Sequence, residues 1–148
     1  MFSDRLNQLC PMQVKEAEHG DRVRTGLVLV APGGRQLEVV RSGGFYEVRL
    51  GGEEKVSGHC PSVDVMMHSV AKHVGANAIG AMLTGMGQDG AMGMLAMKEA
   101  GARCIAQDEA SSVVFGMPKV AYEKGGAERL VPLEKIASSL LSLLMEKK

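Results

Sequence analysis

The chain has 148 residues, enough for one domain with a hydrophobic core, and its 17 Lys and Arg balance its 17 Asp and Glu. The near-zero net charge gives no broad attraction to nucleic acid or acidic lipid, and three Phe and two Tyr are too few for a base-stacking surface. Three scattered cysteines in no CxxC pair, no signal peptide and no apolar run of about 18 residues predict a cytoplasmic protein without membrane insertion.

The first half of the chain predicts a short helix followed by strands. Residues 2–9 have the apolar spacing of an amphipathic helix, and residues 12–16 alternate as a strand does. The continuous apolar run 27–31 predicts a buried strand that stops at a Pro-Gly-Gly turn. Residues 37–40 and 45–50 flank Ser-Gly-Gly, which predicts a β-hairpin.

From Ser62 onward, helices and strands alternate at short spacing. We expect helices over residues 63–74, 91–100, 109–115, 119–124 and 133–145, and strands over residues 78–84, 103–107 and 128–131. Ser62 is the expected N-cap of the first of these helices, and Gly101 ends the second. The pattern predicts one α/β domain over residues 1–148, with three layers: a mainly parallel sheet, helices on both faces and a β-hairpin in the first half. In such sheets, sites form at the carboxyl ends of strands, here after Thr84 and after Gln107.

The turn after the strand at residues 78–84 is rich in glycine and admits three interpretations. Gly85-x-Gly87-x-x-Gly90, followed by Asp108, is close to the fingerprint of a nicotinamide or flavin dinucleotide site. Asp89 weakens that interpretation, because a carboxylate at the helix N-terminus satisfies the helix dipole and repels a pyrophosphate. The second interpretation is a carboxylate that stays ionised and orients a histidine. In the third, Asp89 is only an N-cap and the glycines only form the turn.

Several segments, in the same order, resemble the receptor methylesterases of chemotaxis, which are protein-glutamate methylesterases of the CheB type. Residues 83–91 (LTGMGQDGA) are similar to the family's LTGMGxDGA segment, and residues 61–73 to its PSVD…HSVAK helix. Further similar segments are EAEHGD at 16–21, APGG at 31–34, AQDEASS at 106–112 and VFGMP at 114–118. The resemblance extends from about residue 2 to residue 144, so it is far more specific than one glycine loop.

The resemblance implies a carboxylic ester hydrolase that demethylates glutamates on the cytoplasmic helices of methylated chemoreceptors, with a Ser-His-Asp triad, no cofactor and no metal. Asp89 is similar to the family's catalytic aspartate, which orients the histidine. Met86, flanked by Gly85 and Gly87, would line the site, and its backbone N–H is a candidate donor to the oxyanion. The family's GxSTGG serine turn, His-Met-Pro histidine, first βα region and receiver domain are not evident here. We therefore expect part of a catalytic domain that is incomplete or inactive alone.

Other functions stay open beside this one. The chain could be a non-catalytic descendant that still binds receptor helices, or a dinucleotide-binding protein that uses residues 85–90. Removal of early strands from a parallel sheet would leave an open edge, which predicts low stability or a homo-oligomer across that edge. The spacing of His59, Cys60, Asp64 and His68 could hold a metal, although helix capping and packing explain these residues more simply.

Overall fold

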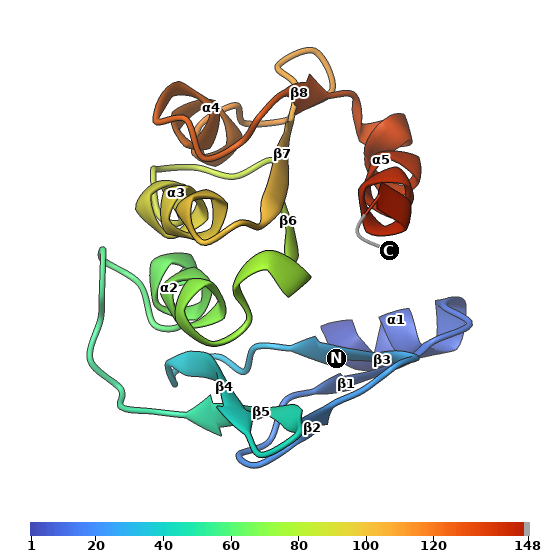
Figure 1. The fold of residues 1–148 in the computed structure, drawn as a ribbon, viewed down its shortest axis with the longest axis vertical. Coiled ribbons are helices and arrows are strands. Elements are labelled where there is room, and N and C mark those ends of the chain that lie inside the picture. Colours follow the sequence, from blue (N-terminus) through green and yellow to red (C-terminus); the bar gives the residue numbers. More distant parts are fainter. Residues whose placement is uncertain (147–148) are drawn as a thin grey trace.

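The N-terminal part of the computed structural model, which describes residues 1–146, combines a helix with a parallel strand pair (Figure 1). Helix α1 (Phe2–Leu9) packs on β1 (Gln13–Glu16), which pairs in parallel with β3 (Leu27–Val30). The predicted helix and both strands are confirmed. β3 was expected to be buried but is only half-buried along its length, because its one strand partner among residues 1–146 is β1.

The first half of the chain also forms an antiparallel sheet. Its order is β2 (Arg22–Val23), β5 (Phe45–Leu50) and β4 (Leu37–Ser42). The predicted hairpin is confirmed, and Gly43 enters its turn with a φ of 63°, which favours glycine. β4 packs against the first helix of the second half and so joins this sheet to the second half of the chain.

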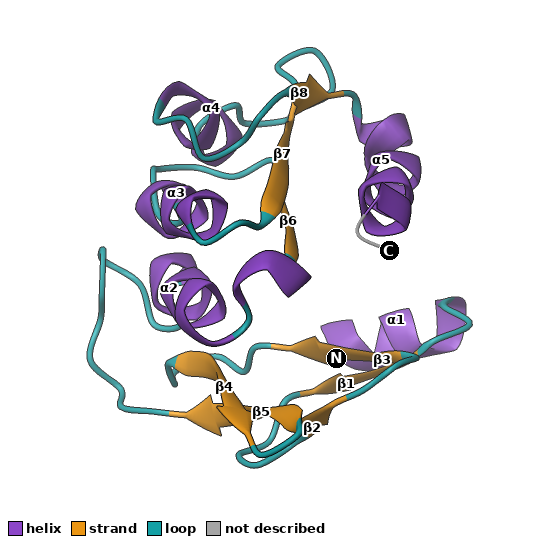
Figure 2. Cartoon of the chain, in the orientation of Figure 1, coloured by secondary structure: helices purple, strands orange, loops and turns teal. Residues whose placement is uncertain are grey.

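The second half forms a parallel α/β unit with helices on both faces, as Figure 2 shows. Its elements, in chain order, are α2 (Val63–His73), η1 (Gly75–Asn77), β6 (Ile79–Met82), α3 (Ala91–Glu99), β7 (Arg103–Gln107), α4 (Met117–Glu123), β8 (Leu130–Val131) and α5 (Leu133–Glu146). The strands are all parallel in the order β6-β7-β8. Helices α3 and α4 cover one face, α5 covers the other, and α2 lies beside α3 (Figure 1). The three-layer α/β arrangement is therefore confirmed.

Two details differ from the sequence prediction. The strands form three separate sheets among the described residues, with β3 and β6 not hydrogen-bonded to each other. Residues 109–115 do not form the predicted helix but a series of turns. The Asp108 carboxylate accepts hydrogen bonds from the N–H and the hydroxyl of Ser111, and the Ser112 hydroxyl donates to the Asp108 carbonyl. Such local side-chain bonds compete with helical hydrogen bonds.

Methionine and small side chains fill the main core. Met67 on α2, Met82 on β6, and Met94 and Met97 on α3 are all at least 95% buried and pack together with small residues of β7. The flexible thioether chains fill the irregular space that aromatic side chains would otherwise occupy. No helix within residues 1–146 is both long and apolar enough to cross a bilayer.

Candidate functional site

The loops that leave the carboxyl ends of β6 and β7 are joined by side chains. Gln107, which is 1% exposed, accepts from the Thr84 N–H (2.8 Å) and donates to the Ser111 carbonyl (2.8 Å). The Thr84 hydroxyl accepts from the Val114 N–H (2.9 Å) and donates to the Val114 carbonyl (3.2 Å). The two loops therefore form one connected surface at the strand ends, where parallel α/β sheets place their sites.

The glycine-rich loop packs backbone to backbone against the start of α4. The Gly85 N–H donates to the Val114 carbonyl (3.0 Å), and the Gly85 carbonyl accepts from the Met117 N–H (2.8 Å). A Cβ at Gly116 would lie 2.8 Å from the Gly85 carbonyl oxygen, so this approach requires glycine. Beyond this contact, Met86 is 80% exposed.

Asp89 is buried and accepts three hydrogen bonds from the start of α2. Its Oδ1 accepts from the Ser62 hydroxyl (2.8 Å) and the Asp64 N–H (3.1 Å), and its Oδ2 accepts from the Val63 N–H (2.8 Å). The carboxylate therefore caps α2, whereas its sequence position beside α3 suggested a cap for that helix. The residue at the N-cap of α3 is Gly90, which has no side chain and a φ of 95°.

The environment of Asp89 favours its ionised form. Burial alone raises the pKa of this carboxyl, but the hydrogen bonds from the Val63 N–H, the Ser62 hydroxyl and the Asp64 N–H outweigh burial. The nearby His59 also favours the negative charge, so the pKa of Asp89 lies below its ordinary value. Asp89 is thus a carboxylate at neutral pH, as a residue that orients a histidine must be.

Gln36 forms hydrogen bonds with the segment before α2 that carries Ser62. The sequence analysis assigned Gln36 no role. Its side-chain oxygen accepts from the Ser62 N–H (2.8 Å), and its amide donates to the Glu54 (2.9 Å) and His59 (3.0 Å) carbonyls. Gln36 is only 6% exposed. The only signal in the sequence is an uncharged polar residue between a glycine turn and an apolar strand.

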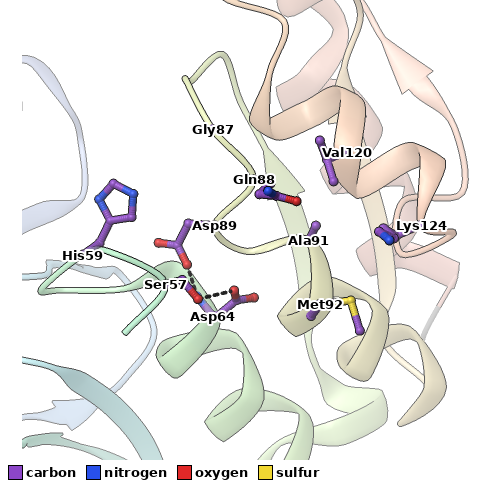
Figure 3. Close-up of a pocket in the computed structure, with 10 residues that line it drawn as sticks. All are labelled: Ser57, His59, Asp64, Gly87, Gln88, Asp89, Ala91, Met92, Val120 and Lys124. Carbon is purple, nitrogen blue, oxygen red and sulfur yellow. Dashed lines mark hydrogen bonds between the residues drawn. The ribbon is translucent and has the colours of Figure 1, made fainter. Parts of the chain in front are cut away.

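A cavity of about 460 Å³ opens beside Asp89. Its lining combines polar and apolar side chains from the loop before α2, from α2, α3 and α4, and from the glycine-rich loop: Ser57, His59, Asp64, Gly87, Gln88, Asp89, Ala91, Met92, Val120 and Lys124. Figure 3 shows His59 next to Asp89 on one side, with Val120 and Lys124 of the α4 region on the other. Of the predicted site residues, Asp89 and Gly87 line this cavity, whereas Gly85 anchors the loop and Met86, which is exposed, is not among the lining residues.

Asp64 is a hydrogen-bond acceptor between segments. Its Oδ1 accepts from the Gly93 N–H (2.8 Å) in α3, and its Oδ2 accepts from the Ser57 hydroxyl (3.2 Å). Among residues 1–146, no three His, Cys, Asp or Glu side chains gather closely enough to hold a metal ion. The spacing of His59, Cys60, Asp64 and His68 therefore does not correspond to a cluster in space.

These contacts also argue against the dinucleotide interpretation of the glycine-rich loop. A pyrophosphate at the start of α3 would meet the Asp64 carboxylate, which already accepts from the Gly93 N–H. Asp108, the acidic residue expected at a ribose, accepts instead from Ser111 of its own turn. Gly90 has a packing role, because a Cβ there would lie 2.5 Å from the Met82 side chain.

Comparisons with known proteins agree with this architecture. A family profile described as CheB methylesterase matches residues 1–140. A protein-glutamate methylesterase/protein-glutamine glutaminase of Syntrophotalea carbinolica is 67% identical over all 148 residues, which span 42% of that protein. The protein of the same name from Salmonella typhimurium is 52% identical over 95% of this chain and 40% of its own length. The chain thus spans less than half of these relatives.

A solved structure is similar over nearly the whole chain. The crystal structure of the Thermotoga maritima CheB methylesterase catalytic domain matches 95% of this chain and 75% of that chain, with a TM-score of 0.91 and 36% identity. The family profile, the relatives and the solved structure agree with one another. This chain belongs to the CheB methylesterase family.

Proposed function

We propose that the chain is part of a protein-glutamate methylesterase catalytic domain in which Asp89 is the aspartate of a Ser-His-Asp triad. The observation that carries the proposal is the buried, ionised Asp89 carboxylate, held by three donors beside a cavity at the strand ends. The serine and the histidine would come from a segment that precedes residue 1 in a longer protein. The names of the relatives supply the reaction class.

The proposed reaction is acyl transfer in two halves. The histidine takes the serine proton while the serine oxygen attacks the ester carbonyl, and the resulting tetrahedral oxyanion expels methanol, which receives that proton. Water then adds to the acyl-enzyme in the same way and releases the glutamate carboxylic acid. Asp89 would hold the histidine tautomer and stabilise its imidazolium form. The Met86 N–H would donate to the oxyanion, on a loop backbone that Gly85 and Gly87 leave unobstructed.

The proposed substrates are glutamate methyl esters on the cytoplasmic helices of methylated chemoreceptors, which makes the cytoplasm the proposed compartment. The names of the relatives also include glutaminase activity. A glutamine side chain presents an acyl carbon at the same position as the ester, with ammonia in place of methanol as the leaving group. No cofactor or metal enters this chemistry.

An add-back experiment tests the proposal. The 148-residue chain is joined to the upstream residues of the Syntrophotalea carbinolica relative, and methanol release from methylated receptor is measured beside the chain alone. We expect release from the joined protein and none from the chain alone. Release from the chain alone, equal to that of the joined protein, would contradict the assignment, because the nucleophile would then lie within residues 1–148. Receptor binding without release by the joined protein would identify a non-catalytic descendant.

A further inference from the structure

Helices α2 and α3 begin side by side, and neither is capped by its own N-cap side chain. Ser62 occupies the N-cap of α2, but its hydroxyl donates to Asp89 instead of accepting from its own helix. Gly90 occupies the N-cap of α3 and has no side chain. Both helix N-termini therefore need acceptors from elsewhere for their unpaired N–H groups.

Each helix receives its acceptor from the other. Asp89, just before α3, accepts from the N–H groups of Val63 and Asp64 in the first turn of α2. Asp64, in the first turn of α2, accepts from the N–H of Gly93 in the first turn of α3 at 2.8 Å. The two carboxylates thus form a reciprocal pair of caps between the helices.

The packing at this point leaves little freedom for either helix. A Cβ at Gly93 would lie 2.7 Å from the Met67 Cβ and 3.2 Å from the Asp64 carbonyl oxygen. Asp64 is 9% exposed, so the Gly93 N–H lies in a region where loss of its acceptor is costly. The Ser57 hydroxyl also donates to Asp64 and ties the loop that carries His59 to the same carboxylate.

We propose that Asp64 is a positioning residue that fixes the start of α3 against the start of α2 and thereby keeps the Asp89 carboxylate on its three donors. All three donors belong to residues 62–64, whereas Asp89 belongs to the loop that leads into α3. The Asp64–Gly93 bond links the same two segments in the opposite direction to the Asp89 bonds. The link to catalysis rests on the proposed function of Asp89.

The charged and titratable groups around the cavity are His59, Lys124 and the two carboxylates. Removal of Asp64 changes both a hydrogen-bond acceptor and a negative charge, so two substitutions are needed to separate these effects. Asp64→Asn removes the charge but keeps an oxygen that can accept from the Gly93 N–H. Asp64→Ala removes both.

The test is a carboxyl NMR titration of Asp89 in the 148-residue chain with Asp64→Ala, Asp64→Asn and Met67→Ala. Loss of a negative neighbour alone would lower the pKa of Asp89, whereas loss of its donors raises it. We therefore expect Asp64→Ala to raise the pKa of Asp89 to its ordinary range or above, and Asp64→Asn to leave it below that range. Met67→Ala weakens the same helix interface through packing, and we expect it to leave the pKa of Asp89 unchanged.

An unchanged or lowered pKa of Asp89 in Asp64→Ala, or an equal rise in Met67→Ala, would overturn the proposal. If Asp64→Ala does not fold, amide hydrogen exchange in Asp64→Asn decides instead. A neutral amide oxygen accepts a weaker hydrogen bond than a carboxylate, so we expect moderately faster exchange at both Gly93 and Val63. Faster exchange at Gly93 alone, or at neither residue, would overturn the proposal.

Activity of the joined protein separates this proposal from the proposed function. Asp64→Ala is expected to lower kcat about tenfold or more at unchanged KM, because small misplacements of a catalytic group are costly. A raised pKa of Asp89 with an unchanged kcat would support the positioning role of Asp64 and contradict the catalytic role of Asp89.

Discussion

The Ser62 hydroxyl donates to the Asp89 carboxylate at 2.8 Å, although the two residues are 27 positions apart in the chain. Ser62 belongs to the segment that begins α2, and Asp89 to the glycine-rich loop. Ser62 was expected to cap α2 itself, and it does occupy the N-cap position, but the acceptor that caps the helix is Asp89. These two segments, both similar to family motifs, therefore hold each other in place.

Asp89→Ala should destabilise the fold, in addition to lowering any activity. The substitution leaves the Ser62 hydroxyl and two N–H groups of α2 without their acceptor, which should lower the free energy of unfolding by about 2 kcal/mol. Urea unfolding of the 148-residue chain measures this, with Glu109→Ala as a control on an exposed acidic residue. A loss no larger than the control's, within about 0.5 kcal/mol, would show that the cap contributes little.

The pH dependence of stability should carry the signature of Asp89. The pKa of Asp89 is lower in the folded state than in the unfolded state, where it is near 4. The contribution of this carboxylate to the free energy of unfolding is therefore fully present above the unfolded pKa and is lost as pH falls through the lower folded pKa. Unfolding of the wild type and Asp89→Asn is compared between about pH 7 and pH 3. The stability difference between the two should shrink as the pH falls below about 4. A difference that stays constant or grows in acid would mean that the pKa of Asp89 is not lowered.

The fold was predictable to the extent that it depends on local pattern. Apolar periodicity identified α1, the hairpin and the alternating second half, and Gly101 follows the end of α3 with a φ of 100°, as a helix-ending glycine should. The helix predicted over residues 109–115 is absent, because the side chains of Asp108 and Ser111 bond locally and Val114 bonds to Thr84. Thr84 lies 30 positions before Val114, so no local sequence pattern predicts this hydrogen bond.

Gly93→Ala should reveal how closely α2 and α3 approach. Alanine is the better helix former by about 1 kcal/mol, but its Cβ would lie 2.7 Å from the Met67 Cβ. Overpacking of this kind typically costs about 1–3 kcal/mol, so we expect a net loss in thermal or urea unfolding. Gly33→Ala, which meets nothing within 4 Å, is the matched control and should be nearly neutral. A stabilised Gly93→Ala variant would contradict the close approach.

Self-association of the chain remains a prediction, and the structure indicates where to test it. β6 has β7 as its one strand partner among the described residues, and a cavity of about 260 Å³ beside it is lined by Asn77, Ile79 and residues of α5. Leu141 and Leu144 of that helix are 62% and 50% exposed. Exposed leucines beside an unpaired strand edge favour association.

Sedimentation velocity over a range of concentrations measures this association. The wild-type chain should form larger species as concentration rises, and the double variant Leu141→Lys with Leu144→Lys should do so less. Leu133→Lys, at a residue that is 53% exposed on the same helix but outside the cavity lining, is the control. A monodisperse wild-type monomer with a cooperative melt would contradict the prediction.

The candidate site was less predictable than the fold, because its geometry depends on contacts between distant segments. The position of Asp89 followed from one motif, yet its partners Ser62 and Asp64 lie 27 and 25 positions earlier. Gln36, which holds Ser62, carries no local signal of that role. Spacing alone suggested a metal cluster around Asp64, whereas in the structure Asp64 bonds to the backbone of α3.

The catalytic role of Asp89 is tested most directly by the kcat for methanol release in the joined protein, compared among wild type, Asp89→Asn and Asp108→Asn. Asn keeps the size of the side chain but cannot stabilise an imidazolium, so we expect Asp89→Asn to lower kcat by about 10⁴-fold. Asp108→Asn, at the acidic residue of the dinucleotide interpretation, should leave kcat nearly unchanged. An Asp89→Asn protein that is folded and retains wild-type kcat would contradict the assignment of Asp89 to the triad.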